Sequence, residues 1–338
     1  MATITEYIEP LLRGENLSFE QAGKLLDIIF EGQVPETQIA AFLTAMRCKP
    51  ATAAELAGLA KSLRAHAVKV NVAIDNLVDT CGTGGAAVKT FNISTAAALV
   101  AAGAGVHVAK HGNRGITSKC GSADVLAALG VNIEAGPETV ARCIREAGIG
   151  FMFAPKYHPA MKYVQPVRKA LGFRTVFNIL GPLANPAGAQ AQVLGVADEA
   201  LMPIVAEALN LLGVRHAMIV HSNGLDEIST MGPTKITELK AGKLTTWTLY
   251  PADCGIKMTV LESLTGGDAK NNAEIVKNIL SGKDTGARKD IVVLNAAAAI
   301  IVGGLANDFA SAVKIGEQAI ISGAASHRLE AMIKISTS

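Results

Sequence analysis

The chain has 338 residues, of which half are hydrophobic and only 4% are aromatic, so its core must be built mainly from Ala, Val, Leu and Ile. That composition is typical of an α/β protein whose helices pack closely on a sheet. The 31 basic and 29 acidic side chains leave a net charge of +2 without a basic run, which argues against nucleic acid as the main partner.

The cysteines and the apolar stretches indicate the cellular compartment of the protein. The five cysteines are scattered and form no CxxC pair, which argues against a zinc site and against a disulfide framework. The N-terminus carries Glu6 and Glu9 and lacks an apolar signal core. The longest apolar stretches, such as residues 96–108, are interrupted by glycine and too short to span a bilayer. We expect a cytoplasmic protein in a reducing compartment, without a membrane partner.

Residues 4–66 are predicted to be entirely helical. Apolar side chains recur at helical spacing, for example within residues 22–29. Ser18 with Gln21 has the pattern of a capping box, and Thr52 marks a further helix start. No strand pattern interrupts these helices, so they can form a small helical domain.

From residue 77 onward, short β-rich runs alternate with helical segments. The predicted strands cover residues 76–78, 106–109, 150–153, 192–196 and 217–221. This alternation implies a mostly parallel sheet, with a hairpin of residues 236–239 and 245–249 at its edge. The tail from residue 273 returns to helices. The expected fold is therefore α/β: a helical domain over residues 1–70, joined by helices from about residues 160–185, and a larger α/β domain over residues 71–338.

A glycine turn follows the first predicted strand, in the sequence DTCGTGGAAVKTFNIST of residues 79–95. Its glycines let the backbone turn several N–H groups inward, which makes a nest for an anion. The helix predicted from Thr95 adds partial positive charge at the same place. Phosphate suits such a loop best, although the turn fits neither GxGxxG nor GxxxxGK[ST]. The alternative is a plain connection between strand and helix.

A second polar segment, KHGNRGITSKCG of residues 110–121, follows the strand predicted at residues 106–109. It precedes a helix whose expected cap is Ser122. Loops at the carboxyl ends of parallel strands bind ligands in α/β sheets, and Lys110 and Arg114 would suit a polyanion. The alternatives are a solvated polar loop and, for His111, a structural histidine.

Two further features could carry chemistry. Asp226 and Glu227 are adjacent carboxylates that could present oxygens to Mg²⁺, with an ordinary acidic turn as the alternative. Pro166 fits the first turn of a helix but breaks a helix interior, so a kink or restart is predicted just before Arg168. That break could aim the Arg168 guanidinium at a carboxylate, and the alternative is an exposed helical arginine.

Taken together, these segments resemble the anthranilate phosphoribosyltransferase family. The matching text is DTCGTGG, KTFNIST, AKHGNR, SKCGSADVLAALG, HPAMKYVQPVRKALGFRTVFNILGPLANP, HSNGLDEIS and KNILSG, and it covers nearly the whole chain. The resemblance implies transfer of a phosphoribosyl group from 5-phosphoribosyl 1-pyrophosphate (PRPP) to the amino nitrogen of anthranilate, in tryptophan biosynthesis. It also implies the fold of the pyrimidine nucleoside phosphorylases, Mg²⁺ as cofactor, and a homodimer joined through the helical domain.

The resemblance further implies roles for individual residues, none of them as a general acid or base. Mg²⁺ would be bound by Ser94, Asp226 and Glu227, and anthranilate by Gly82, Asn113 and Arg168. The residues implied for PRPP are Gly82, Gly85, Ala86, Thr90, Asn92, Ile93, Ser94, Thr95, Lys110, His111, Gly112, Asn113, Arg114, Gly115, Ile116, Thr117, Ser118 and Ser122.

One position departs from the family pattern. The family usually reads GTGGD at the first loop, and this chain has Ala86 where that aspartate stands. The metal stoichiometry and the pyrophosphate affinity are therefore left open. Two other functions are alternatives: a pyrimidine nucleoside phosphorylase of the same fold, and a non-catalytic paralogue that binds a ligand or nucleic acid. The KHGNR and NGLDE segments argue against the first.

Overall fold

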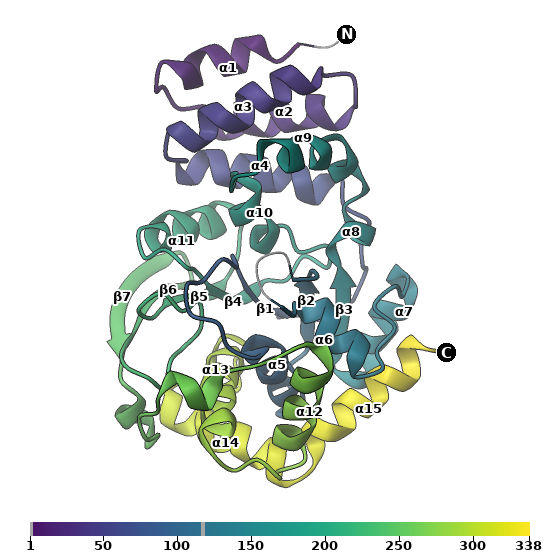
Figure 1. Cartoon of the computed structure of the whole chain (residues 1–338), viewed down its shortest axis with the longest axis vertical. Coiled ribbons are helices and arrows are strands. Elements are labelled where there is room, and N and C mark those ends of the chain that lie inside the picture. The colour runs from purple at the N-terminus through teal and green to yellow at the C-terminus, as the bar shows by residue number, and fades with distance from the viewer. Residues whose placement is uncertain (1–2, 116–118) are drawn as a thin grey trace.

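A layer of helices lies at one end of the molecule and a twisted sheet lies in its middle (Figure 1). The computed structural model describes residues 3–115 and 119–338. The predicted site residues Ile116, Thr117 and Ser118 fall outside the described residues. The described part confirms the expected fold class, a helical N-terminal region followed by an α/β region with a mostly parallel sheet.

The N-terminal helices, drawn in purple in Figure 1, form a layer with two helices from later in the chain, and the apolar core of this layer continues into the helix Leu201–Leu211 and the sheet. These helices are α1 (Thr5–Leu12), α2 (Phe19–Phe30), α3 (Glu36–Cys48), α4 (Ala53–Ala65), α9 (Gln165–Leu171) and α10 (Phe177–Leu183). The predicted capping box is confirmed, because the Ser18 side chain accepts from the Gln21 N–H while the Gln21 side chain accepts from the Ser18 N–H. Thr52 begins α4 in the same way.

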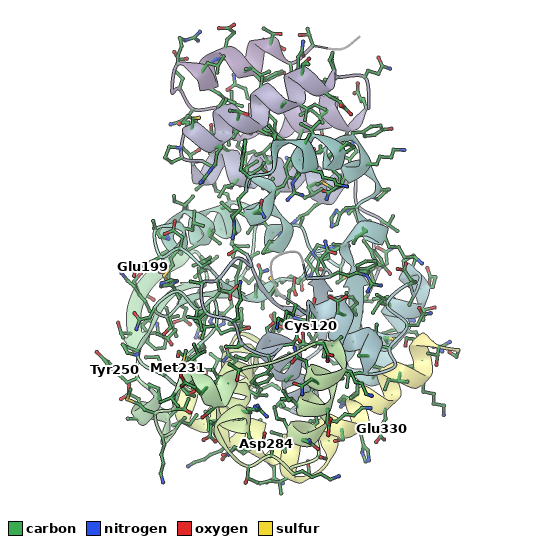
Figure 2. The ribbon with its side chains drawn as sticks, in the orientation of Figure 1. Cys120, Glu199, Met231, Tyr250, Asp284 and Glu330 are labelled. Carbon is green, nitrogen blue, oxygen red and sulfur yellow. The ribbon has the colours of Figure 1, made fainter. Side chains whose placement is uncertain are left out.

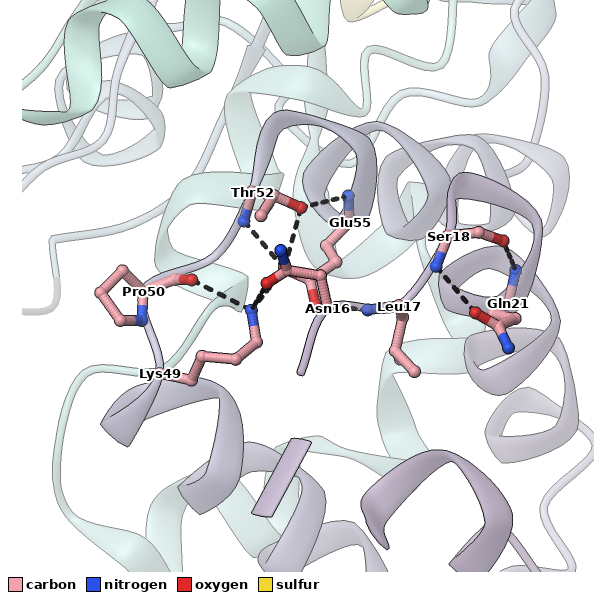
Figure 3. A network of polar contacts seen from close by, with 8 residues as sticks. All are labelled: Asn16, Leu17, Ser18, Gln21, Lys49, Pro50, Thr52 and Glu55. Carbon is pink, nitrogen blue, oxygen red and sulfur yellow. Dashed lines mark hydrogen bonds and ion pairs between the residues drawn. The ribbon is translucent and has the colours of Figure 1, made fainter. Parts of the chain in front are cut away.

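A buried ion pair joins two loops of this helical layer (Figure 3). The Glu55 side chain is fully buried, and its Oε2 accepts from Lys49 Nζ at 2.8 Å. The other oxygen accepts from the backbone N–H of Leu17 at 2.9 Å, and Lys49 Nζ also donates to Asn16 Oδ1 at 2.9 Å. Because each charge has several partners, this pair fixes the α1–α2 loop against the α3–α4 loop.

The sheet has seven strands in the order β3-β2-β1-β4-β5-β6-β7. The strands are β1 (Val78–Gly82), β2 (Val108–Gly112), β3 (Ile149–Phe153), β4 (Ala191–Gly195), β5 (His216–His221), β6 (Thr234–Lys240) and β7 (Lys243–Leu249). Strands β1 to β5 are parallel, and β6 and β7 form the predicted antiparallel hairpin at the edge. Its turn residues, Ala241 and Gly242, both have positive φ, as a two-residue hairpin turn requires.

Helices cover both faces of the sheet (Figure 1). Side chains alternate along each strand. In β5, Ala217 and Ile219 therefore belong to the core under the helical layer, whereas Met218 and Val220 belong to the core under the helices Ile93–Gly103 and Ala287–Val302. The remaining helices are α5 (Ile93–Gly103), α6 (Ser122–Ala128), α7 (Pro137–Arg142), η1 (Cys143–Ala147), α8 (Ala154–Tyr157), η2 (Pro159–Tyr163), α11 (Leu201–Leu211), η3 (Pro251–Cys254), η4 (Leu261–Leu264), α12 (Ala269–Leu280), α13 (Ala287–Val302), α14 (Phe309–Ile321) and α15 (Ala324–Ser336).

The strand order places a crevice at the carboxyl end of β1. The chain runs outward from β1 through β2 to β3 and then returns to the other side of β1 with β4. Ligands bind in open α/β sheets where the strand order reverses in this way. The two predicted loops and the predicted carboxylates all follow strands next to this point. Among the described helices, none has both the length and the apolar character needed to cross a membrane.

Candidate active site

The glycine turn lies directly after β1 and has a conformation that only glycine adopts easily. Gly84 and Gly85 have φ values of +64° and +78°, in the left-handed region. Gly82, the last residue of β1, has normal φ but no space for a side chain, because an added Cβ would lie 2.6 Å from Asp226 Oδ2. The N–H of Thr83 donates to the carbonyl of Gly195 at 2.9 Å, which holds the turn against the end of β4.

Helix α5 begins at Ile93, two residues before the predicted start. Its Asn92 cap makes no side-chain bond to the helix. Instead, Oε1 of Glu227 accepts from the N–H of Ser94 at 3.1 Å, so a carboxylate occupies the positive end of the helix dipole. Asn92 turns to other segments and donates to the carbonyl of Cys120 at 3.2 Å. Figure 2 shows Cys120 near the middle of the molecule, far from labelled side chains at the periphery such as Glu330.

Asp226 and Glu227 form a partly buried acidic pair in the loop after β5. Burial raises the pKa of both carboxyl groups, and the neighbouring Asp226 charge raises the pKa of Glu227 further. The charge of Lys110 and the Ser94 N–H oppose that rise. Two neighbouring, partly buried carboxylates that line a cavity form a site at which a divalent cation would relieve their repulsion. The residues present therefore fit Mg²⁺, a hard cation that prefers oxygen ligands.

The protein could supply only part of the coordination of such an ion. Among the described residues, no group of three or more His, Cys, Asp or Glu side chains is placed to hold a metal. Mg²⁺ is usually bound by one or two carboxylates together with substrate phosphates and water. A metal held here would take its remaining ligands from substrate phosphates or water.

The expectation that Lys110, His111 and Gly112 follow a strand as loop residues is wrong. Strand β2 begins two residues later and ends three residues later than predicted, and these three residues pair with β3. Lys110 is buried and donates to the Thr80 carbonyl and, at 3.3 Å, to Thr80 Oγ1. Buried Asp79 beside it accepts from the His111 N–H at 3.2 Å, and burial raises the Asp79 pKa to about 6. Lys110 therefore places a cation beneath the site.

The expected cap of helix α6 is also corrected, since the cap is Gly121 and Ser122 is the first helical residue. The reason is Asp124, whose Oδ2 accepts from the N–H groups of Gly121 and Gly115 at 2.9 Å each. Asp124 Oδ1 also accepts from Arg114 Nη1 at 2.9 Å. This carboxylate closes the loop on itself and neutralises the arginine that was expected to face a polyanion.

Two adjoining cavities lie at the carboxyl edge of the sheet. The first, of about 340 Å³, is lined by the glycine turn, the start of α5, the β2–α6 loop and both acidic residues. Every described residue that was predicted for PRPP or Mg²⁺ lines it. The second, of about 460 Å³, lies between the sheet and the helical layer and includes Arg168 and Asn113. Gly82, predicted to contact both substrates, lines only the first, whereas Thr83 lines both.

The wall of the second cavity combines two cations, Arg168 and Lys162, with neutral rings. Arg168 lies three residues into α9, because Pro166 restarts the helix as predicted, and its guanidinium lies 5.4 Å from the Phe177 ring centroid. The rings of His111 and His158 are 5.0 Å apart, and burial lowers their pKa values to about 3 and about 4. Both imidazoles are thus neutral at neutral pH, which leaves an aromatic, weakly polar cavity beside a guanidinium.

The sequence analysis missed three polar residues that line the first cavity. Arg174 donates to carbonyls of the glycine turn, Lys89 donates to the Ala86 carbonyl at 2.6 Å, and Asn178 lines both cavities. Lys89 carries a local signal, since it stands within the glycine-rich segment. Arg174 carries none, because its partners Thr83 and Gly84 lie far away in sequence.

Comparisons with known proteins agree over almost the whole chain. The family model described as "Glycosyl transferase family, helical bundle domain" matches residues 5–67, and "Glycosyl transferase family, a/b domain" matches residues 74–326. The anthranilate phosphoribosyltransferase of Chloroflexus aggregans is 51% identical over 336 residues, and that of Desulfatibacillum aliphaticivorans is 48% identical over 331 residues. Each alignment covers 98% of both chains.

Solved structures show the same similarity. Anthranilate phosphoribosyltransferase from Thermus thermophilus has a TM-score of 0.93 at 40% identity, covering 98% of this chain and 99% of that one. The enzyme from Saccharomyces cerevisiae in complex with PRPP and Mg has a TM-score of 0.89 at 30% identity. Its complex with 4-fluoroanthranilate has a TM-score of 0.88 at 30% identity. Both yeast comparisons cover 98% of this chain and 97% of the other.

Proposed function

This chain belongs to the anthranilate phosphoribosyltransferase family, and we propose that it transfers the phosphoribosyl group of PRPP to the amino nitrogen of anthranilate, in tryptophan biosynthesis. The observation that carries the proposal is the pair of adjoining cavities, which share Thr83, His111, Asn113 and Asn178 in their walls. A transferase needs its donor and its acceptor side by side, and these walls differ in the way that those two substrates require.

The first cavity suits the donor. Its glycine turn and the start of α5 offer N–H groups to a diphosphate, and the β2–α6 loop adds further polar groups. Asp226, Glu227 and Ser94 would hold Mg²⁺ together with the pyrophosphate oxygens. When bound, that ion supplies positive charge that stabilises the leaving pyrophosphate. The yeast relative solved with PRPP and Mg supports this assignment.

The second cavity suits the acceptor. To other described residues, the Arg168 guanidinium makes long bonds there, at 3.3 Å to Gln165 Oε1 and 3.5 Å to Asn178 Oδ1. It can exchange these weak contacts for a paired interaction with the carboxylate of anthranilate. Neutral imidazoles and the Phe177 ring would pack against the aromatic ring of the substrate. Asn113, which lines both cavities, and Gly82 at the donor side would complete the contacts proposed for anthranilate.

The proposed chemistry relies on positioning and electrostatics. Transfer breaks a C–O bond at the anomeric carbon, so the transition state resembles an oxocarbenium ion, and pyrophosphate gains charge as it leaves. The attacking aromatic amine is neutral at neutral pH, and its nitrogen loses a proton readily once it is alkylated. A strong general base is therefore unnecessary, which is consistent with the low pKa values of His111 and His158. Holding the two reactants together can contribute about 7–11 kcal/mol.

A fluorescence assay tests the proposal directly. Purified protein is mixed with anthranilate, PRPP and Mg²⁺, and the loss of anthranilate fluorescence is followed. We expect a loss that depends on all three additions. Phosphate-dependent release of a pyrimidine base, with no loss of anthranilate, would instead establish the nucleoside phosphorylase. Binding without any turnover would favour a non-catalytic paralogue.

We also propose that the protein is a cytoplasmic homodimer joined through the helical domain of residues 1–70. An isolated piece of about sixty residues buries only about 60% of its chain surface, so it needs a partner surface. Helices α9, α10 and α11 cover one side of this layer, and Leu12 on α1 is 65% exposed on another. Sedimentation velocity at micromolar concentration should show a dimer, and a protein that stays monomeric would contradict the proposal.

A further inference from the structure

Arg174 connects two segments that are far apart in sequence. It lies in the short connection between α9 and α10, which belong to the helical layer. From there, its Nη2 donates to the carbonyl of Gly84 at 3.0 Å and to the carbonyl of Thr83 at 3.4 Å. Both carbonyls belong to the glycine turn after β1. A side chain held by the helical layer therefore reaches the turn that is proposed to receive the diphosphate.

The guanidinium fits closely against this turn. A Cβ on Gly85 would lie 1.3 Å from Arg174 Nη1, so the guanidinium fills the space that a side chain would need. Arg174 also lines the first cavity. Carbonyl oxygens at the edge of a cavity that holds a diphosphate would repel it. Donation from a permanent cation satisfies these oxygens and offsets their partial negative charge.

The same connection continues to the wall of the second cavity. The backbone N–H of Thr175, the residue after Arg174, donates to Asn178 Oδ1 at 2.9 Å. That oxygen also lies 3.5 Å from Nη2 of Arg168, the proposed ligand of the anthranilate carboxylate. A continuous line of contacts thus runs from Arg168 through Asn178 and the Arg174 segment to the glycine turn.

We propose that Arg174 is a positioning residue, which holds the glycine turn in the form that receives the diphosphate and sets it at a fixed place relative to the acceptor wall. The proposal deepens the proposed function and rests on it. Arg174 affects donor binding indirectly, because it orients the carbonyl groups of Thr83 and Gly84 and thereby the glycine turn. Removal of the side chain should therefore affect the donor first, with the acceptor contacts of Arg168 left in place.

The test compares Arg174→Ala and Arg174→Lys with Lys169→Ala. Lys169 is an exposed cation on α9 that lines neither cavity, so its removal is a matched loss of charge from the same region. Binding of PRPP with Mg²⁺ is measured by isothermal titration calorimetry. The values of kcat and of KM for both substrates follow from the fluorescence assay, and the melting temperature reports on the fold.

We expect Arg174→Ala to weaken donor binding by about tenfold, the loss typical of a hydrogen bond to a charged group. Its kcat should fall, while the anthranilate KM and the melting temperature stay close to those of the natural protein. Arg174→Lys should restore only part of the donor affinity, because the ammonium keeps the charge but lacks the reach and planar shape of the guanidinium. Lys169→Ala should match the natural protein.

Unchanged donor affinity in Arg174→Ala would overturn the proposal, and so would full recovery in Arg174→Lys, which would show that charge alone matters. If Arg174→Ala melts at a much lower temperature than the natural protein, the donor affinities of Arg174→Lys and Lys169→Ala are compared instead. A weaker affinity in Arg174→Lys alone would support the proposal, and equal affinities would overturn it. The calorimetric measurement needs no turnover. A natural protein that binds PRPP but consumes no anthranilate would therefore refute the proposed function, while the donor affinities would still decide the role of Arg174.

Discussion

The carboxylate of Glu227 accepts a hydrogen bond of 3.1 Å from the backbone N–H of Ser94, at the first turn of helix α5. This bond joins the loop after β5 to the helix that follows β1. Next to it, the Asp226 carboxylate takes the space that a side chain at Gly82 would need. The acidic pair, the glycine turn and the helix start therefore form one continuous unit, in which a diphosphate and a metal ion would contact each other.

Replacing both Asp226 and Glu227 with alanine should abolish most Mg²⁺-dependent turnover and leave the fold intact. The proposed metal stabilises the transition state by several kcal/mol, so we expect a loss of about a hundredfold or more in kcat/KM. Initial rates over a range of Mg²⁺ concentrations check this. Glu199→Ala, which removes an exposed carboxylate paired with Lys235, is the control and should leave the titration unchanged. Survival of the rate and of its Mg²⁺ dependence in the double variant would contradict the assignment.

Arg168→Ala should raise the KM for anthranilate far more than the KM for PRPP. The guanidinium is the cation of the second cavity that lies over the Phe177 ring, and its existing bonds are long. Loss of a charge-assisted contact to a carboxylate costs about 1.5–3 kcal/mol, or roughly a 10- to 100-fold rise in KM. Steady-state kinetics with each substrate varied in turn measure both constants, with Lys169→Ala as the control. An unchanged anthranilate KM would rule out this role.

The sequence predicts best those features that depend on local backbone geometry. The glycine turn is an example, because Gly84 and Gly85 need positive φ wherever the turn is placed. The restart of the helix at Pro166 and the capping box at Ser18 are similar, since each depends on residues within one turn of helix. For the same reason, the alternation of strands and helices predicts the mostly parallel sheet.

Features set by distant partners could not be predicted. Strand β2 extends to Gly112 because it pairs with β3, about forty residues further along the chain, which residue-level periodicity does not show. Arg174 bonds to Gly84, 90 residues away in sequence, and nothing near it signals that contact. Asp124 moves the start of α6 to Gly121 through a loop that closes only in three dimensions. The residues that line the donor cavity can thus be predicted from sequence motifs, whereas the contacts that hold them in place are known only from the three-dimensional structure.

Breaking the buried ion pair of Lys49 and Glu55 should lower the stability of the protein strongly. Glu55→Gln removes the charge with almost no change of shape and leaves Lys49 buried without its counter-ion, which should lower the free energy of unfolding by about 3 kcal/mol. Urea denaturation followed by far-UV circular dichroism measures this. Glu15→Gln breaks the exposed pair with Arg13 and should barely change stability. Equal effects of the two substitutions would show that burial of the pair does not matter.

Ala86 predicts an unusual response to Mg²⁺. Its side chain is buried in the glycine turn and lines the donor cavity, whereas that of Ala87 is exposed and does not. An aspartate at position 86 would place a negative charge beside the diphosphate. At about 4 Å and an effective dielectric of about 20, that repulsion costs roughly 4 kcal/mol before a metal compensates. The alanine avoids this repulsion and also removes a possible ligand for a second Mg²⁺.

The natural protein should therefore need less Mg²⁺ to bind its donor than Ala86→Asp does, and it should respond more weakly to high Mg²⁺. The measurement is a Mg²⁺ titration of the initial rate at the same saturating PRPP concentration. Ala87→Asp is the matched control, because it adds the same charge one residue away, outside the cavity wall, and should follow the natural protein. Superimposable curves for all three proteins would show that the side chain at position 86 does not interact with the metal. A carboxylate near the metal would have shifted the titration curve of Ala86→Asp away from the other two.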